Sequence, residues 1–306
     1  MRRIFTLFLT VILLLSACEP SEQGDAQTDP NLPEDTLAQN PPARIEFASP
    51  EGLATDGEFI YVSNVGAELE PLAVDGDGYI LKLSPDLREA YDRERLAAIP
   101  LNAPKGMVAH NKHLYVADID RLVVIDLKQL EQVAQYDFSR FGVNFLNDVA
   151  VKDDSTLYVS ATNSNQIFQV NLIDENFERL ETEDLHGPNG LFYQSEERKL
   201  YCVEWGTGEP NGRLIAIDPP TGKIRVLNDH TGNLDGVAFL RSGDLIFSDW
   251  TSNRLLTLNM VSNEITALPG DSILGPADFL YDPATDQLYV PHMVENKVSI
   301  LSGSLL

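Results

Sequence analysis

Residues with metal-ligating oxygens recur at a regular spacing along this chain. Each stands directly before a Gly or Asp in a short phrase, such as PNG, LND or LDG, that runs into an apolar stretch. Six such marker residues follow one another at intervals of 54, 42, 42, 46 and 42 positions: Glu51, Lys105, Asn147, Asn189, Asp235 and Ala277. Four of them carry carboxylate or amide oxygens, the ligands that hard cations such as Ca²⁺ prefer. The absence of nitrogen and sulfur donors from this set argues against Zn²⁺ or Cu²⁺ as the preferred ion.

Turn chemistry is the alternative explanation for these phrases. Asn-Gly and Asp-Gly are common turn pairs for local reasons that involve no ligand. The same position also holds Glu51 before Gly52 and Lys105 before Gly106, which are not favoured turn pairs. We therefore interpret the marker as a structurally equivalent position whose side chain varies, and predict a cation site if the fold brings the four donors together.

The sequence around each marker predicts a repeated unit of four strands. A second strand-like run follows shortly after each marker, then a polar turn, a third run and a more polar fourth segment. The runs are rich in Val, Ile, Leu, Tyr and Phe and are separated by Gly, Asn, Asp and Pro, as in short antiparallel strands. A repeat of this length with four strands is typical of a propeller blade. Six units predict an all-β, six-bladed β-propeller over residues 45–306.

The two ends of this domain are expected to share one blade. The last unit stops after its third strand, near Ile300, and residues 44–48 precede the first marker as fourth strands precede the others. We predict that this N-terminal strand closes the ring and removes an exposed sheet edge. Markers that begin the innermost strands should then gather at one mouth of the central channel. A second ring is expected downstream of the markers, at the ends of the second strands, where it either lines the pocket or bonds loop backbones: Asn64, Asp118, Thr162, Glu204, Asp249 and His292.

The first 44 residues read as an export signal and a tether. Arg2 and Arg3 precede a twelve-residue apolar run, residues 4–15, which is too short to span a bilayer. The ending LSAC resembles a bacterial lipoprotein cleavage box, which predicts a signal peptide over 1–17 and lipidation of Cys18; an ordinary signal with a chance Cys is the alternative. Residues 18–44 are acidic and Pro-rich and predict a disordered tether. We expect an exported protein anchored to the cell envelope, with the outer membrane favoured by Glu19.

The composition of the chain limits the classes of partner that it is expected to bind. The chain of 306 residues has 47 acidic against 22 basic side chains and a net charge of −25. Such a surface repels nucleic acid and offers no polybasic patch for lipid, so Cys18 is the expected membrane contact. With Cys18 lipidated, Cys202 has no intramolecular partner and is expected to be a buried apolar residue. A monomer that binds a small molecule is expected.

Residues 45–306 resemble the family of gluconolactonase, regucalcin (senescence marker protein) and luciferin-regenerating enzyme, which are six-bladed propellers. Members hold one divalent cation in the axial channel through a first-blade Glu, two Asn and an Asp. The resemblance rests on PEGLATD, FLNDVAV, GPNGLFY and LDGVAF, in this order at blade spacing. It implies that Glu51, Asn147, Asn189 and Asp235 ligate the ion, with Ca²⁺ expected and Zn²⁺, Mn²⁺ or Mg²⁺ as alternatives.

The resemblance also implies a metal-dependent hydrolysis of lactones or related small esters. A bound cation polarises the carbonyl and lowers the pKa of bound water, while Asp235 acts as ligand and general base. Lys105, Asn147 and His292 are expected to contact the substrate, Lys105 through a carboxylate or developing oxyanion. Lys105 as a mere balance for the acids, and His292 as a structural histidine, are the alternatives. The family's sugar-reading Arg has no clear counterpart, so a non-catalytic propeller that binds a ligand or protein partner is the competing function.

Overall fold

The computed structural model describes residues 45–208, 211–229 and 232–302. These belong to a compact unit, Ala43–Leu306. The predicted signal peptide (1–17), lipidated Cys18 and tether (18–44) lie outside the described residues. None of the helices in the described part of the chain is long and apolar enough to cross a membrane.

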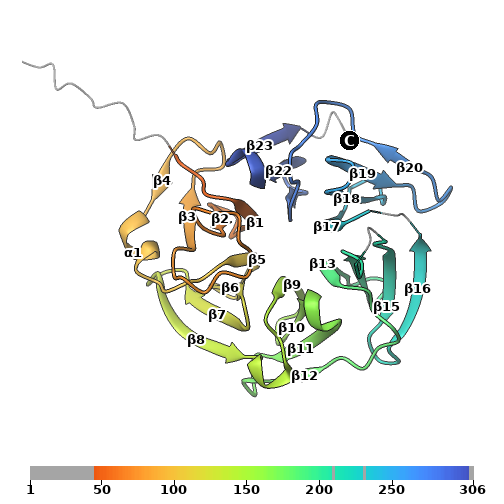
Figure 1. Cartoon of the computed structure of the whole chain (residues 1–306), viewed down its shortest axis with the longest axis horizontal. Coiled ribbons are helices and arrows are strands. Elements are labelled where there is room, and N and C mark those ends of the chain that lie inside the picture. Colours follow the sequence, from red (N-terminus) through yellow and green to blue (C-terminus); the bar gives the residue numbers. More distant parts are fainter. Residues whose placement is uncertain (1–44, 209–210, 230–231, 303–306) are drawn as a thin grey trace, which may run out of the picture. The chain divides into compact units, whose positions relative to one another are not determined.

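Six small antiparallel sheets surround a central channel, which confirms the predicted all-β, six-bladed propeller (Figure 1). The first blade contains β1 (Pro50–Thr55), β2 (Ile60–Asn64), β3 (Tyr79–Leu83) and β4 (Ala90–Tyr91). The second contains β5 (Pro104–His110), β6 (His113–Asp118), β7 (Arg121–Asp126) and β8 (Glu131–Asp137). The third contains β9 (Leu146–Asp153), β10 (Thr156–Ala161), β11 (Gln166–Asn171) and β12 (Asn176–Arg179).

The remaining three blades follow the same order from the channel outward. The fourth contains β13 (Pro188–Gln194), β14 (Lys199–Glu204), β15 (Leu214–Asp218) and β16 (Lys223–Asn228). The fifth contains β17 (Leu234–Phe239), β18 (Leu245–Asp249), β19 (Arg254–Leu258) and β20 (Ile265–Ala267), and the sixth β21 (Leu280–Asp282), β22 (Gln287–His292) and β23 (Lys297–Ser302). Helical turns are short: α1 (Arg93–Ala97), η1 (Ser139–Phe141), η2 (Thr162–Ser164) and η3 (Met293–Glu295).

The N-terminal segment closes the ring, but by side-chain packing and not by strand pairing. Ile45 and Phe47 pack against an apolar cluster that includes Val298 and Ile300 of β23. Residues 45–47 belong to no strand, so the sixth sheet has three strands. The reason lies at Ser49, whose backbone is left-handed (φ 51°) and whose carbonyl accepts a hydrogen bond from the N–H of Val65 in the first blade. The Ser49 N–H still joins the blades by donating to Asn296 Oδ1 at 2.7 Å.

Apolar side chains between neighbouring blades form the core. Strand-internal residues such as Tyr61, Tyr158, Tyr201 and Tyr289, one in each of four second strands, are fully buried. Cys202 lies in the same layer, buried and unpaired, as predicted. Because each sheet packs on two neighbours, the innermost strands are held rigidly around the channel, and this rigidity is what positions the site.

Candidate functional site

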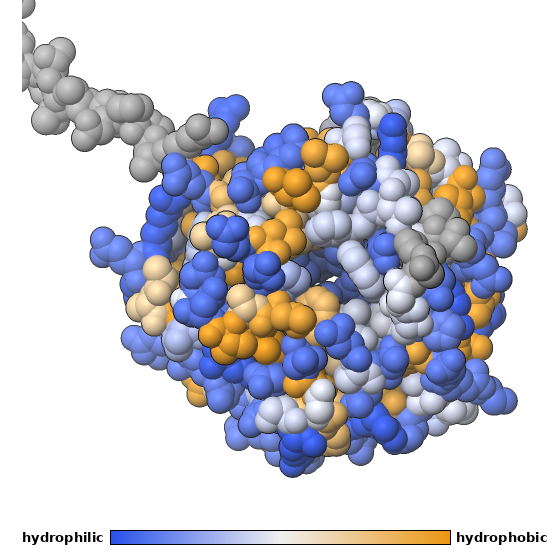
Figure 2. Space-filling model, in the orientation of Figure 1, coloured by the Kyte–Doolittle hydropathy of each residue, from blue (hydrophilic) through white to orange (hydrophobic). Residues whose placement is uncertain are grey.

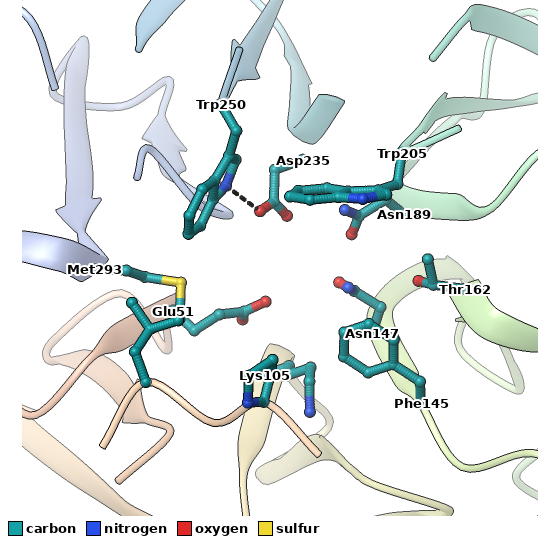
Figure 3. A pocket seen from close by; sticks show the side chains of 12 residues that line it. Glu51, Lys105, Phe145, Asn147, Thr162, Asn189, Trp205, Asp235, Trp250 and Met293 are labelled. Carbon is teal, nitrogen blue, oxygen red and sulfur yellow. Dashed lines mark hydrogen bonds between the residues drawn. The ribbon is translucent and has the colours of Figure 1, made fainter. Parts of the chain in front are cut away.

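The four predicted donors come together at one mouth of the channel. Glu51, Asn147, Asn189 and Asp235 line a single cavity of about 260 Å³, and Lys105 lines it with them. All four donors are at most 4% exposed. Figure 3 shows their side chains pointing toward a common centre from four different blades. Residues separated by up to 184 positions in the chain, 51 to 235, are thereby brought into one site.

A bulge in the innermost strands directs these side chains into the channel. The register between first and second strands shifts immediately around the marker, for example between Pro50 and Leu53 in β1 and between Pro188 and Leu191 in β13. Such a bulge re-aims a side chain out of the regular pleat. In the fifth blade the shift falls between Leu234 and Val237. Marker phrases that resemble turns are therefore bulges that face the channel.

Serines of the second strands support the bulges from behind. Ser63 Oγ accepts a hydrogen bond from the Gly52 N–H at 2.8 Å, and Ser248 Oγ accepts one from the Gly236 N–H at 2.8 Å. Four blades have glycine after the marker, where neighbouring strands approach closely. A Cβ on Gly52 would lie 2.7 Å from the Lys105 carbonyl oxygen of the next blade. The bulge thus turns the marker side chain toward the channel, and the glycine that follows it allows the neighbouring blade to approach closely.

Each of the four donors has one buried oxygen without a hydrogen-bond partner among the described residues. These atoms are Glu51 Oε2, Asn147 Oδ1, Asn189 Oδ1 and Asp235 Oδ1. Leaving a buried acceptor unsatisfied costs about 1–3 kcal/mol, so native proteins retain few of them. Only two other such side-chain atoms occur in the described residues, Tyr158 Oη and Gln166 Oε1. A hard cation bound among these four oxygens would satisfy them and remove this cost.

The remaining polar atoms of two donors are fixed, which sets the direction of the free ones. The Trp250 Nε1–H donates to Asp235 Oδ2 at 2.7 Å, so Oδ1 faces the channel (Figure 3). The Asn189 Nδ2–H donates to the Leu234 carbonyl at 3.1 Å, which leaves its Oδ1 as the channel-facing atom. The two side chains are therefore preorganised as oxygen donors.

Burial and mutual repulsion raise the pKa values of the channel acids. Burial, followed by the negative charge of Asp235, raises the pKa of Glu51 well above its ordinary value. Burial also raises the pKa of Asp235 to about 7, although the hydrogen bond from Trp250 lowers it. Lys105 is the one basic residue among those lining the cavity, and its own pKa is lowered by burial to about 8. The raised pKa values favour the neutral acids in the metal-free channel, and a bound cation would favour their ionised forms.

Two further acids lie next to the ring and were not predicted from the sequence. Asp148 and Asp278 stand one residue after the markers Asn147 and Ala277, where four other blades have Gly, and both are buried. Burial raises the pKa of Asp148 to about 6, and burial together with Asp148 raises that of Asp278 well above its ordinary value. Asp148 Oδ2 accepts a hydrogen bond from the Leu191 N–H at 2.6 Å. The signal was present as Asp in place of Gly in the phrases LND and PAD.

Lys105 lines the cavity, but its amine is already engaged. The side chain is 1% exposed, and Nζ donates to the Ala103 carbonyl at 2.8 Å. The same nitrogen lies 4.8 Å from the centroid of the Phe145 ring. Lys105 therefore contributes positive charge near Glu51, and its amine is held in the cavity wall by this hydrogen bond.

Side chains of the predicted second ring form hydrogen bonds to loop backbones. Asp118 accepts hydrogen bonds from the backbone N–H groups of Asn102 and Ala103, and Glu204 accepts one from that of His186. Thr162 does line the cavity, although its hydroxyl donates to the Pro188 carbonyl at 2.9 Å. Buried polar side chains at the ends of second strands thus satisfy the loop backbones that a propeller leaves unpaired.

The prediction that His292 contacts substrate is not supported. His292 is not among the residues that line the cavity. Its Nδ1 lies 2.9 Å from Glu295 Oε2 and its Nε2 lies 2.9 Å from Ser299 Oγ, so both ring nitrogens are occupied. Burial lowers its pKa below the ordinary value. His292 is the structural histidine that was the alternative interpretation.

An apolar wall above the donors was also missed. It consists of six apolar residues that line the cavity: Leu69, Pro71, Phe145, Trp205, Trp250 and Met293. Trp205, Trp250 and Met293 each follow directly after a member of the second ring. In these three blades the second-ring residue bonds other groups and the next residue lines the cavity. Sequence position identified the right strand ends, but in these blades the side chain that lines the cavity is one residue further on, whereas Thr162 lines it directly.

The donor set fits a hard divalent cation. Within the described ranges, no group of three or more His, Cys, Asp or Glu side chains is arranged to hold a metal. The ring instead combines two carboxylates with two amide oxygens, which suits Ca²⁺ and leaves positions for water or substrate. The unsatisfied oxygens Glu51 Oε2, Asn147 Oδ1, Asn189 Oδ1 and Asp235 Oδ1 are the observation on which this fit rests.

Comparison with known proteins identifies the fold and no closer relationship. No protein family and no curated protein matches the sequence. Among solved structures, hydrazine synthase from Kuenenia stuttgartiensis is similar with a TM-score of 0.61 and 16% identity, over 87% of this chain and 80% of that one. A catalytically inactive virginiamycin B lyase from Staphylococcus aureus, solved with quinupristin, has a TM-score of 0.55 and 15% identity over 83% and 94% of the two chains. A Bacteroides thetaiotaomicron protein of unknown function has a TM-score of 0.63 and 13% identity over 84% and 70%. At these identities the likeness shows the propeller fold alone.

Proposed function

We propose that this protein is a divalent-cation-dependent hydrolase of lactones or related small esters. The observation that carries the proposal is the convergence of four buried, unsatisfied oxygens from four blades on one cavity: Glu51 Oε2, Asn147 Oδ1, Asn189 Oδ1 and Asp235 Oδ1. The resemblance of the four marker phrases to the gluconolactonase and regucalcin family supports the same assignment. Ca²⁺ is the proposed ion because all donors are oxygens.

When bound, the cation supplies a Lewis acid that polarises the carbonyl and acidifies water. Asp235 would hold the ion through Oδ1, because Oδ2 is held by the Trp250 N–H, and its carboxylate would also accept the proton of the attacking water. Burial raises the pKa of Asp235 to about 7 in the metal-free protein, and a bound cation would lower it and so favour the ionised form that acts as a base. Asn147 contributes a donor oxygen that also faces the substrate. Lys105 offsets part of the negative charge of the ring from the cavity wall.

A panel of lactones and esters tests this function. The protein is assayed with Ca²⁺, Mn²⁺, Zn²⁺ or Mg²⁺ and with chelator, alongside Asp235→Ala. We expect turnover with at least one ion, loss of turnover with chelator, and loss of more than about a hundredfold in Asp235→Ala, as for removal of a general base. Turnover that survives both treatments would refute the proposal.

A non-catalytic binding protein is the second candidate. The observation that favours it is the position of Lys105, which is 1% exposed and whose amine is held in the wall by its hydrogen bond to the Ala103 carbonyl. In this case the cation stabilises the ring and the cavity binds a small molecule or a segment of a partner. Cation-dependent ligand binding without turnover of any ester in the panel would favour this alternative.

We propose that this activity is located at the cell envelope, on the basis of the N-terminal residues. Lipidation of Cys18 after removal of residues 1–17 would anchor the chain, with residues 18–44 as tether. Several acyl chains give stable anchoring, since each buried methylene contributes roughly 0.8 kcal/mol. The outer membrane is the favoured location and the protein is proposed to be monomeric.

A further inference from the structure

We propose that the site takes small lactones bearing an apolar group, and rejects polyhydroxylated sugar lactones. This inference rests on the proposed function for the reaction, but the preference for an apolar ligand can be measured by binding alone. The twelve residues lining the cavity divide into the four oxygen donors, two polar wall residues and six apolar wall residues. The reactive end of a ligand would meet the donors, and the rest of the ligand would meet the wall.

The polar wall residues are few, and each already makes one hydrogen bond to the protein. Lys105 Nζ donates to the Ala103 carbonyl at 2.8 Å, and the Thr162 hydroxyl donates to the Pro188 carbonyl at 2.9 Å. The Trp250 indole N–H is committed to Asp235 at 2.7 Å. The hydroxyls of a bound polyol would lose their hydrogen bonds to water and would outnumber the polar wall groups that can replace them, which is the condition under which a pocket rejects a polar ligand.

The apolar wall is continuous and partly aromatic. The rings of Trp205 and Trp250 contact each other edge to face, with centroids 5.7 Å apart. Phe145 and Met293 line the same cavity, Phe145 beside Asn147 and Met293 beside Glu51 (Figure 3). Figure 2 shows the channel mouth as a hollow at the centre of the ring with hydrophobic side chains beside it. At about 260 Å³ the cavity is smaller than the ~300–1,000 Å³ typical of sites for drug-sized ligands, so the ligand is small.

An insertion in the first blade supplies the last part of the wall. Residues 66–78, between β2 and β3, carry Leu69 and Pro71 to the cavity. The Asp77 carboxylate anchors this insertion by accepting a hydrogen bond from the Ala67 N–H at 2.8 Å. Gly66 is required beside it, since its φ is 147° and a Cβ would lie 2.1 Å from Asp77 Oδ1. A loop with polar side chains at these positions could fold equally well and would suit a sugar. The apolar residues found here therefore point to an apolar ligand.

Tryptophan fluorescence tests the ligand class directly. The chain has two tryptophans, and both line the cavity. We would titrate the full protein, in millimolar Ca²⁺, with an alkyl-substituted δ-lactam and with a polyhydroxylated δ-lactam of the same ring size. Lactams resist hydrolysis, and neither compound absorbs at the excitation wavelength of tryptophan. We expect the alkyl lactam to change the fluorescence at a concentration at least tenfold below that of the polyol.

A matched pair of substitutions in the insertion shows where the ligand sits. Leu69→Asn should raise the Kd of the alkyl lactam about tenfold, since one methylene contact in an apolar pocket already discriminates about 10–200-fold. Val74→Asn, in the same insertion but 72% exposed and outside the cavity lining, should leave the Kd unchanged. Both variants keep the tryptophans and alter solvent-exposed side chains, so folding is preserved.

The outcomes separate this inference from the proposed function. Tighter binding of the polyol, absence of binding by either lactam, or equal effects of the two substitutions would each overturn the inference. Binding of the alkyl lactam without hydrolysis of the matching lactone would leave the ligand class standing and refute the hydrolase. Hydrolysis of sugar lactones in preference to alkyl lactones would uphold the hydrolase and refute the ligand class.

Discussion

Replacing Asp235 by Asn should stabilise the metal-free protein at pH 8, although the residue belongs to the proposed reaction machinery. Burial raises the pKa of Asp235 from 3.8 to about 7. Because the folded pKa lies above the unfolded one, folding stability is fully present below pH 3.8 and is lost as the pH rises through about 7. At pH 8 the ionised carboxylate therefore lowers the free energy of unfolding by roughly 4 kcal/mol.

The amide variant removes most of this penalty. Asn keeps the shape and an acceptor for the Trp250 N–H, but burying the amide costs about 1–3 kcal/mol. The net gain is about 1–3 kcal/mol, or roughly 2–10 °C in melting temperature for a domain of this size. Addition of Ca²⁺ should reverse the order. A ligand at a hundred times its Kd adds about 2.7 kcal/mol to the native state, and Asp235→Asn should bind the ion too weakly to gain this.

Thermal denaturation at pH 8, in chelator and then in Ca²⁺, measures both effects. Asp249→Asn is the matched control, because Asp249 is a buried aspartate of the same blade that accepts hydrogen bonds from the Thr251 and Ser252 N–H groups and does not line the cavity. It should lose stability in chelator and keep the full response to Ca²⁺. A lower melting temperature of Asp235→Asn in chelator, or an undiminished response to Ca²⁺, would refute the reasoning.

Other substitutions test the same geometry. Asn189→Leu should weaken Ca²⁺ binding at least tenfold by calorimetry, since it removes one of four donor oxygens; unchanged affinity would exclude it as a ligand. Trp250→Phe keeps the wall but removes the hydrogen bond that lowers the pKa of Asp235, so the acidic limb of the pH–rate profile should move to higher pH, and a fixed limb would argue against Asp235 as base. His292→Ala should leave KM unchanged and lower the free energy of unfolding by about 1–3 kcal/mol, whereas a raised KM would restore it to the site. Cys18→Ser should move the protein from the membrane to the soluble fraction, and retention in the membrane would contradict lipid anchoring.

The blade count and the donor set could be predicted from the sequence because both depend on repetition. A marker before Gly or Asp recurs at nearly constant intervals, each time followed by strands of the same type, and this pattern admits few arrangements other than a ring. In a ring, equivalent positions meet at the axis whatever the details of the loops. The convergence of Glu51, Asn147, Asn189 and Asp235 therefore followed from their order and spacing.

Features without a repeat escaped prediction. The sixth blade lacks its fourth strand because Ser49 turns the backbone toward the first blade, a local conformation that the letters RIEFA do not encode. His292 is the last residue of its second strand, whereas Trp250 directly follows the last residue of the second strand in its own blade. His292 bonds Glu295 and Ser299, while Trp250 reaches Asp235 in the cavity. Which of two adjacent residues faces the cavity depends on the turn that follows the strand.

By itself, the sequence determined the number of blades, the identity of the oxygen donors and the acidic character of the chain, because these depend on residue type and period alone. Only the tertiary structure decided which oxygens remain unsatisfied, which acids join them and what covers them. The physical reason is that hydrogen-bond satisfaction is a property of neighbours. Asp235 presents one free oxygen to the channel because Trp250 holds the other, and the apolar wall is extended by Leu69 and Pro71, which an insertion in the first blade carries to the cavity.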